Sequence, residues 1–330
     1  MGSVELVCPA GSPAMLRAAV EAGADSVYCG LRDDTNARNF PGLNFSPAEL
    51  ADSVAWAHDR GAKVLLAVNT FARAGAGDRW RASVDAAART GVDAVIAADL
   101  GVLAHARAAH PDLRLHLSVQ AAAGSPEAIA FYAETYGVKR VVLPRVLSVE
   151  EIAALMRETT VETEAFVFGG LCVMAEGRCA LSSYVTGRSP NLSGVCSPPE
   201  AVSYTDEQGA LVSRLGGLAL DRYGPGEPAG YPTLCKGRFD VEGRQAYLFE
   251  DPVSLNAMSL LAALSRAGVT AVKIEGRQRG KAYVARVAAA FRGAIDALDQ
   301  GADPTPFESL LTDLAEGGRE TAGAYRKTWR

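Results

Sequence analysis

The chain alternates between short apolar runs and longer segments in which apolar residues recur every three or four positions. The apolar runs are rich in β-branched residues, as in 63–71 (KVLLAVNTF) and 93–100 (DAVIAADL), which indicates buried strands. Alanine-rich segments such as 46–61 (SPAELADSVAWAHDRG) and 125–137 (SPEAIAFYAETYG) have the helical period, and each starts with Ser-Pro. The chain therefore repeats a strand–helix unit.

This pattern predicts eight strands. They cover 4–11, 26–31, 63–71, 93–100, 113–120, 139–145, 164–170 and 270–277, with further helices at 12–23, 251–268 and 281–301. Eight strands alternating with helices predict an α/β fold, a TIM-like parallel β/α barrel, whose catalytic residues lie at the carboxyl ends of the strands. An open doubly wound sheet is the alternative, but no G-x-G-x-x-G sequence opens a helix to support it.

One segment interrupts the pattern, and it carries most of the cysteines. Residues 169–248 are rich in Gly, Ser, Pro and Arg, so we expect three parts: 1–168 with the first seven strands, 169–248 as an insertion at the active-site face, and 249–330 as the helix, strand and helix that close the barrel. Four of the six cysteines lie in the insertion: Cys172, Cys179, Cys196 and Cys235. Cys8 and Cys29 end the first two strands, where we expect them to pack at the barrel rim.

Three explanations fit four thiols in a loop. Buried structural cysteines are expected inside strands and helices rather than among glycines and prolines. A structural zinc site usually takes ligands in close pairs, whereas the spacing here is C-x6-C-x16-C-x38-C. An iron–sulfur cluster also needs four thiolates and can take them from separated loops. Spacing alone favours the cluster modestly and leaves all three open.

Composition and charge narrow the class of protein. A chain of 330 residues with 48% hydrophobic residues can bury a large core. The net charge of −5 gives no overall basic field, which argues against a nucleic acid partner. No apolar stretch approaches the roughly 20 residues of a transmembrane segment, and the start of the chain does not read as a secretory signal. We therefore expect a cytoplasmic protein, whose thiols stay reduced.

Several segments resemble a known family. Residues 5–31, the FVFGGLCVMAEGRCALSSY segment at 166–184 and VKIEGRQRGKAYVARV at 272–287 are similar to the collagenase-like peptidase family, over nearly the whole chain. Within it, DDTNARNFPGLNFS at 33–46 and YPTLCKGRF at 231–239 resemble the branch that acts in oxygen-independent ubiquinone biosynthesis.

The resemblance implies a cofactor, a reaction and partners. It implies a 4Fe-4S cluster on Cys172, Cys179, Cys196 and Cys235, and a heterodimer with a homologous subunit that hydroxylates ubiquinone precursors without O2. A lipid-binding accessory protein is expected because the substrate is polyprenylated, and prephenate is the expected hydroxyl donor. The wider family often has another cysteine soon after the third, but this chain reads CSPPEAV, so Cys235 is taken as the fourth ligand.

Polar residues at the predicted strand ends are candidate substrate ligands, because these ends meet at one mouth of a barrel. They are Asn36, Arg38, Asn39, Asn69, Gln120, Arg145, Lys273, Glu275 and Arg277. Three of them, Arg38, Arg145 and Arg277, carry guanidinium forks suited to the two carboxylates of prephenate. Taken singly, each could also be an ordinary solvated or ion-paired residue.

Two other functions remain as alternatives. A peptidase is suggested by the family name, but the sequence has neither H-E-x-x-H nor G-x-S-x-G. Of the four histidines, we expect His58, His105 and His110 on surface helices and His116 packed within a strand. A non-catalytic, cluster-bearing partner subunit is the other alternative, which the polar strand ends argue against.

Overall fold

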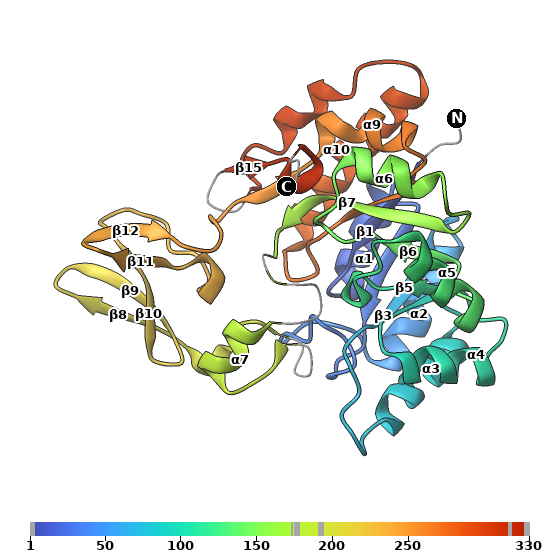
Figure 1. Cartoon of the computed structure of the whole chain (residues 1–330), viewed down its shortest axis with the longest axis horizontal. Coiled ribbons are helices and arrows are strands. Elements are labelled where there is room, and N and C mark those ends of the chain that lie inside the picture. Colours follow the sequence, from blue (N-terminus) through green and yellow to red (C-terminus); the bar gives the residue numbers. More distant parts are fainter. Residues whose placement is uncertain (1–3, 173, 175–178, 191–194, 316–318, 327–330) are drawn as a thin grey trace.

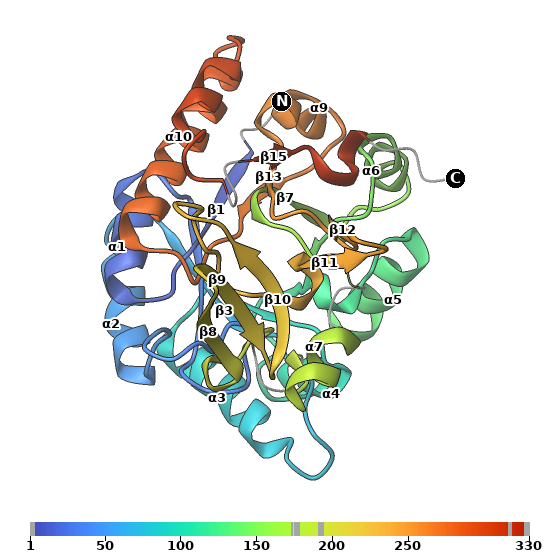
Figure 2. The same ribbon diagram turned by 90° about the vertical axis from the view of Figure 1, so that its left-hand side faces the viewer.

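Eight parallel strands close into a barrel surrounded by helices (Figures 1 and 2). The structure is a computed structural model that describes residues 4–172, 174, 179–190, 195–315 and 319–326. The barrel strands are β1 (Glu5–Pro9), β2 (Ser26–Gly30), β3 (Lys63–Val68), β4 (Ala94–Ala97), β5 (Leu115–Leu117), β6 (Arg140–Val142), β7 (Glu162–Gly170) and β14 (Ala271–Ile274). Because β14 pairs in parallel with both β1 and β7, the sheet is closed, and the predicted TIM-like fold is confirmed.

Helices cover the outside of the barrel. They are α1 (Pro13–Glu21), α2 (Pro47–His58), α3 (Asp78–Thr90), α4 (Leu100–Ala109), α5 (Pro126–Tyr136), α6 (Val149–Met156), α9 (Leu261–Arg266) and α10 (Lys281–Asp299). The Ser-Pro signals are correct, since Ser12, Ser46 and Ser125 each accept a hydrogen bond from the backbone N–H three residues later. Within the described ranges, no helix combines the length and apolar character that a membrane crossing requires.

The helix predicted at 251–268 is wrong over its first half. Residues Ser254–Asn256 form β13, which pairs antiparallel with the end of β7 and in parallel with β15 (Glu320–Thr321). The helix α9 begins only at Leu261. The reason is tertiary: β7 is nine residues long and extends past the barrel, so its free edge offers backbone partners that helical periodicity cannot reveal.

The segment between β7 and β13 builds two small antiparallel sheets. The first contains β8 (Val202–Glu207), β9 (Ala210–Leu215) and β10 (Leu218–Tyr223), and the second contains β11 (Arg238–Val241) and β12 (Arg244–Tyr247). The short helix α7 (Ala180–Thr186) precedes them. Figures 1 and 2 show these elements standing apart from the helical layer, in front of the barrel end from which β7 emerges.

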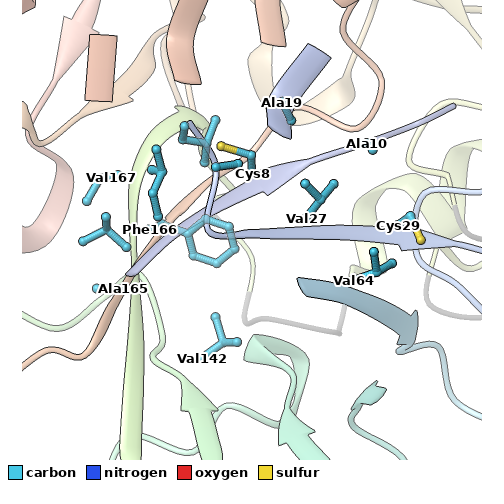
Figure 3. Packing of buried hydrophobic residues seen from close by; sticks show 14 of the residues in the cluster. Cys8, Ala10, Ala19, Val27, Cys29, Val64, Val142, Ala165, Phe166 and Val167 are labelled. Atoms are coloured by element: carbon cyan, nitrogen blue, oxygen red, sulfur yellow. The ribbon is translucent and has the colours of Figure 1, made fainter. Parts of the chain in front are cut away.

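Cys8 and Cys29 lie in the core between the strands and the helices (Figure 3). Both are fully buried, in the same cluster as Ala19 and Val27. The sequence predicted that both cysteines would pack at the rim of the barrel. Side chains of a strand point alternately to its two faces, and those of Cys8 and Cys29 point to the face that the helices cover. Burial raises the pKa of Cys29 to about 12 and also raises that of Cys8, so both remain unreactive thiols.

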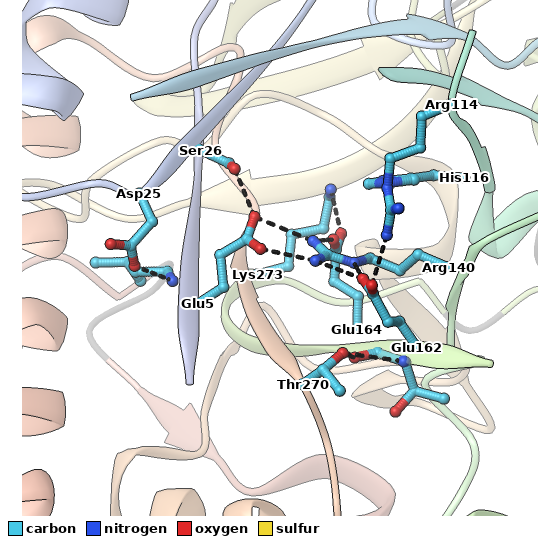
Figure 4. A network of polar contacts seen from close by, with 12 residues as sticks. Glu5, Asp25, Ser26, Arg114, His116, Arg140, Glu162, Glu164, Thr270 and Lys273 are labelled. Carbon is cyan, nitrogen blue, oxygen red and sulfur yellow. Dashed lines mark hydrogen bonds and ion pairs between the residues drawn. The ribbon is translucent and has the colours of Figure 1, made fainter. Parts of the chain in front are cut away.

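A network of charged side chains crosses the interior of the barrel (Figure 4). The Arg140 guanidinium pairs with Glu5 at 2.7 Å, with Glu162 at 2.8 Å and with Glu164 at 3.5 Å. The Lys273 ammonium is 2.5 Å from the other oxygen of Glu164. Since Arg140, Glu164 and Lys273 are all buried, each charge depends on its partners to offset the cost of leaving water.

Candidate functional site

The four cysteines of the insertion come from four separate segments. Cys172 follows the end of β7 and is exposed, and Cys179 is the residue before α7. Cys196 lies in the loop before β8, and Cys235 lies in the short 3-10 turn Leu234–Lys236. Cys179, Cys196 and Cys235 are partly buried.

These thiols are close enough to affect one another electrostatically. Burial raises the pKa of Cys196, Arg38 opposes that effect, and negative charge on Cys172 and Cys179 raises the pKa further. The pKa of Cys235 is raised to about 12, by burial first and then by charge on Cys172, with smaller contributions from Cys196 and Cys179. The fold therefore brings these thiols within electrostatic range of one another, although 62 residues lie between Cys172 and Cys235 in the sequence.

Aromatic contacts hold the gathered segments in place. The hydroxyl of Tyr231 donates to the carbonyl of Ser197 at 2.9 Å, which ties the chain before Cys235 to the chain after Cys196. The Tyr231 ring also meets Phe40 edge to face, with centroids 5.9 Å apart. Phe40 belongs to the loop that follows β2, so the insertion contacts the barrel mouth directly.

The sulfurs, as a set, are spaced more widely than the ligands of one tetrahedral zinc ion. A tetrahedral zinc with Zn–S bonds of about 2.3 Å requires its sulfurs roughly 3.8 Å apart. Among the described residues, which include all four cysteines, no three of these sulfurs lie within 4.8 Å of one another. A cluster of several iron and sulfide ions spans a wider set of thiolates.

An ion pair at the mouth lies beside the cysteines. Arg38, in the loop after β2, donates from Nε to Oε1 of Glu275, just after β14, at 3.2 Å. Burial alone would lower the pKa of Arg38, but Glu275 and Cys196 outweigh it and raise the pKa. Arg38 thus faces both the carboxylate and the cysteine group. A Cβ on Gly169 would lie 2.5 Å from the Glu275 carbonyl oxygen, so only glycine permits this approach.

Arg145, in the turn that follows β6, is the second guanidinium near Glu275. Its Nη1 donates to the carbonyl of Gly170 at 2.8 Å, and its guanidinium stacks over Phe166 at 4.5 Å from the ring centre. Burial would raise the pKa of Glu275, but the positive charges of Arg38 and Arg145 outweigh it and hold the pKa below its ordinary value. Arg38 therefore pairs with this carboxylate at the mouth, and the positive charge of Arg145 acts on the same carboxylate.

Arg277 is the third guanidinium of the mouth and is buried. Its Nη1 donates to Oδ1 of Asn36 at 3.2 Å, and its guanidinium lies 5.5 Å from the Tyr28 ring centre. Burial lowers the pKa of Arg277 to about 10. The same Asn36 oxygen accepts the backbone N–H of Arg38 at 2.9 Å, so one amide positions both arginine residues.

Three further predicted ligands, Asn39, Asn69 and Gln120, lie in loops or turns that follow barrel strands. Asn69 accepts the backbone N–H of Ala37 at 2.9 Å and so supports the loop that carries Arg38. Gln120 follows β5, and its buried Oε1 has no hydrogen-bond partner among the described residues. Asn39 is partly buried in the loop after β2.

Lys273 does not lie with the other predicted ligands at the mouth of the barrel. Its ammonium pairs with Glu164 in the barrel interior and lies 3.8 Å from the centre of the Tyr28 ring. Arg277 contacts the same ring, so Tyr28 separates the mouth from the charged layer beneath it.

Sequence reasoning missed three contributors to this site. Tyr28 donates to the Ile274 carbonyl at 2.9 Å, and its apolar strand context gave no signal of a role. Asn44 holds the Arg38 carbonyl through its Nδ2 at 2.9 Å. Gly30 leaves room for the site, because a Cβ there would lie 2.6 Å from the Asn36 side chain. In the sequence, the only signal of these contacts was the NARNFPGLN stretch at 36–44.

Comparisons with known proteins identify the family of this chain. Residues 11–323 match the model of peptidase family U32. The chain is 32% identical over 334 residues to the tRNA hydroxylation protein P of Escherichia coli (strain K12), covering 95% of this chain and 72% of that protein. It is 31% identical over 300 residues to the 23S rRNA 5-hydroxycytidine C2501 synthase of the same strain, covering 89% of this chain and 40% of that protein.

Among solved structures, the chain is similar to the U32 peptidase Mk0906. The identity is 26%, the TM-score is 0.42, and the match covers 51% of this chain and 70% of that one. Since the family model spans residues 11–323 and relatives above 30% identity align over most of the sequence, this chain belongs to peptidase family U32.

Proposed function

We propose that this protein is the iron–sulfur subunit of an oxygen-independent hydroxylase of ubiquinone precursors, of the UbiU kind. The observation that carries the proposal is the gathering of four cysteines beside Arg38 at the mouth of the barrel. Hydroxylation as the reaction class is supported by relatives that are named as hydroxylation proteins. The choice of a ubiquinone precursor as the substrate rests on the resemblance of residues 33–46 and 231–239 to the branch that acts in oxygen-independent ubiquinone biosynthesis.

The four thiolates Cys172, Cys179, Cys196 and Cys235 would hold a 4Fe-4S cluster. When bound, such a cluster supplies one-electron transfer. The chain's own contribution is electrostatic, because the Arg38 guanidinium stabilises negative charge at Cys196. Glu275 keeps that guanidinium oriented through the 3.2 Å ion pair.

Prephenate is the proposed hydroxyl donor. It carries two carboxylates, which suit the guanidiniums of Arg38, Arg145 and Arg277. Loss of carbon dioxide and the ring hydroxyl makes its ring aromatic and supplies the driving force. Transfer of that oxygen to an aromatic C–H of the acceptor yields phenylpyruvate, carbon dioxide and the phenol. Together, the prephenate dianion and the aromatic C–H release two electrons and one proton, so two equivalents of a one-electron acceptor must be present.

The residues of the mouth would bind and orient rather than form covalent bonds. Asn36 fixes Arg277 and the backbone of Arg38 in one arrangement, which reduces the entropy lost when a dicarboxylate binds. The unsatisfied Oε1 of Gln120 is a hydrogen-bond acceptor for a substrate O–H or N–H group.

Partners complete the proposed enzyme. The resemblance implies a heterodimer with a UbiV-like homologous subunit, and a lipid-binding accessory protein would deliver the polyprenylated substrate. Cys172 is exposed, so a partner surface would also shield the centre from oxygen. Co-expression followed by size-exclusion chromatography tests this: elution of the two chains together supports the pair, and separate elution with the cluster retained argues against it.

An oxygen-labelling experiment tests the reaction. The anaerobic complex receives prephenate labelled with heavy oxygen in its ring hydroxyl, a ubiquinone precursor and a one-electron acceptor. Mass spectrometry should find the label in the new ring hydroxyl. Label arriving from heavy water alone would eliminate prephenate as the donor. A complex that holds its cluster but hydroxylates no precursor would overturn the proposed function.

Hydroxylation of a nucleoside base is the second candidate. It is favoured by the 32% identity to a protein named for tRNA hydroxylation, and disfavoured by the net charge of −5. Mass spectrometry of bulk tRNA and rRNA nucleosides from a strain lacking this gene separates the two candidates. Loss of a hydroxylated nucleoside with ubiquinone unchanged would favour RNA, and the reverse would favour the quinone precursor.

The positions of the histidines do not support a peptidase activity. His58 pairs with Asp93, His105 and His110 pair with Asp85, and His116 is buried against Arg114. All four histidines of the chain are thus engaged away from the mouth, so no imidazole is placed to activate a serine or cysteine there. Cleavage of gelatin that a point mutation at the mouth abolishes would reverse this conclusion.

A further inference from the structure

Two histidines converge on one aspartate on the outer surface of the barrel. The Nε2 atom of His105 lies 2.9 Å from Oδ1 of Asp85, and the Nε2 atom of His110 lies 2.7 Å from the same oxygen. The two rings are nearly perpendicular, with an interplanar angle of 82° and centroids 6.2 Å apart. Two imidazole nitrogens and a carboxylate oxygen therefore point to one place from different directions.

Neighbouring helices build this cluster. Asp85 lies in α3 and His105 lies in α4, and Figure 1 shows these helices side by side on the outside of the barrel, away from the insertion. His110 is the C-cap residue directly after α4, where its φ of −136° and ψ of 68° turn the chain. The C-terminal end of a helix carries partial negative charge, which favours a cation.

The cluster is accessible but not fully solvated. The side chains of Asp85, His105 and His110 are 35%, 22% and 28% exposed. A small ion can therefore enter from solvent, and the three side chains lose less motional freedom on binding than fully exposed ones would. Among the described residues, this is the group of three metal-ligating side chains whose ligand atoms all lie within 4.8 Å.

A second histidine–aspartate contact, between His58 and Asp93, serves as a comparison because it has one imidazole and not two. Nε2 of His58 lies 2.9 Å from Oδ2 of Asp93, and the same oxygen accepts the backbone N–H of Val64 at 2.7 Å. That arrangement has one imidazole, and its oxygen also accepts a backbone hydrogen bond, so it ties a helix to a strand. His58 is therefore a matched control within the same chain.

The distances in the cluster suit a transition-metal ion. Tetrahedral zinc with bonds of about 2.0–2.2 Å needs ligand atoms roughly 3.3 Å apart. The N–O distances of 2.9 and 2.7 Å would have to open by only about half an ångström. Imidazole suits zinc, cobalt and nickel ions, whereas magnesium and calcium prefer all-oxygen sites.

We propose that Asp85, His105 and His110 form a binding site for a first-row divalent transition-metal ion that cross-links α3 to α4. Three protein ligands leave at least one coordination position for water. The site is separate from the cysteine group and does not depend on the proposed hydroxylase function.

Histidine ring signals in NMR spectra give a direct test. The chain has four histidines, so a ring-selective spectrum has few signals to assign. Zinc is added to anaerobic protein beyond the amount that saturates the thiols. The ring signals of His105 and His110 should shift and saturate together, while that of His58 stays in place. Equal shifts of all three at the same zinc concentration would overturn the proposal.

Cobalt binding to variants provides the second test. His105→Gln and His110→Gln each keep an N–H donor for Asp85 but lose the imidazole lone pair. Calorimetry should find one Co²⁺ per chain fewer, or at least about tenfold weaker binding at this site, in each variant than in the wild type. His58→Gln should match the wild type. Because all four proteins keep the thiols, cobalt bound to cysteine cancels in the comparison, and identical isotherms would refute the site.

Discussion

Replacing Glu5 with glutamine removes a charge from the network inside the barrel. The Glu5 oxygens accept hydrogen bonds from Arg140 at 2.7 and 3.1 Å and from the Ser26 hydroxyl at 2.5 Å. Burial would raise the pKa of Glu5, but these partners outweigh it and lower the pKa from 4.5 to about 2. A shift of that size corresponds to about 3 kcal/mol of folding free energy.

The direction of the pH dependence follows from the lowered pKa. A carboxyl whose pKa falls on folding contributes stability that is present above its unfolded pKa and is lost as the pH drops through its folded pKa. For Glu5 that window runs from about 4.5 down to about 2. Glu5→Gln should therefore lower the free energy of unfolding by about 3 kcal/mol at pH 7, and by less than half as much at pH 3.

Urea unfolding followed by circular dichroism at both pH values measures this difference. The control is Glu134→Gln on α5, because Glu134 is exposed and an exposed substitution should change stability by under about 0.5 kcal/mol. A loss below about 0.5 kcal/mol for Glu5→Gln at pH 7 would refute the reasoning. A loss of the same size at both pH values would show that the charge is not its source.

Two further predictions concern the mouth. Gly30→Ala places a Cβ 2.6 Å from the Asn36 side chain and 2.9 Å from Nη1 of Arg277, so prephenate affinity should fall at least about tenfold in calorimetry. Gly280→Ala is its control, since Gly280 has φ −74° and no atom within 4 Å of an added Cβ; equal losses in both would contradict the argument. Arg145→Lys keeps the charge but loses the fork, so prephenate binding should weaken with iron content unchanged, and unaltered binding would remove Arg145 from the site.

The barrel could be predicted from the sequence because local patterns determine its elements. The run 63–71 is apolar and β-branched, and Ser46 with Pro47 starts a helix, so element type and order follow without tertiary information. The strand Ser254–Asn256 could not be predicted, since it exists only because the edge of β7 is available for pairing.

The candidate site was predictable as a location but not as an arrangement. Strand ends of a barrel meet at one mouth, which places Arg38, Arg145 and Glu275 together. Lys273 lies deeper because the register of β14 against β7 sets it close to Glu164, and strand register cannot be read from either strand alone. The role of Asn36 depends on the path of an irregular loop, for which residue periodicity gives no signal.

The iron and sulfide content of protein purified without air tests the central claim most directly. A cluster on the four cysteines of the insertion predicts brown protein with about four iron and four sulfide per chain. Cys235→Ala should lose the iron, whereas Cys29→Ala, which alters a core thiol, should retain it. One zinc per chain with no iron, even after anaerobic reconstitution, would contradict the account.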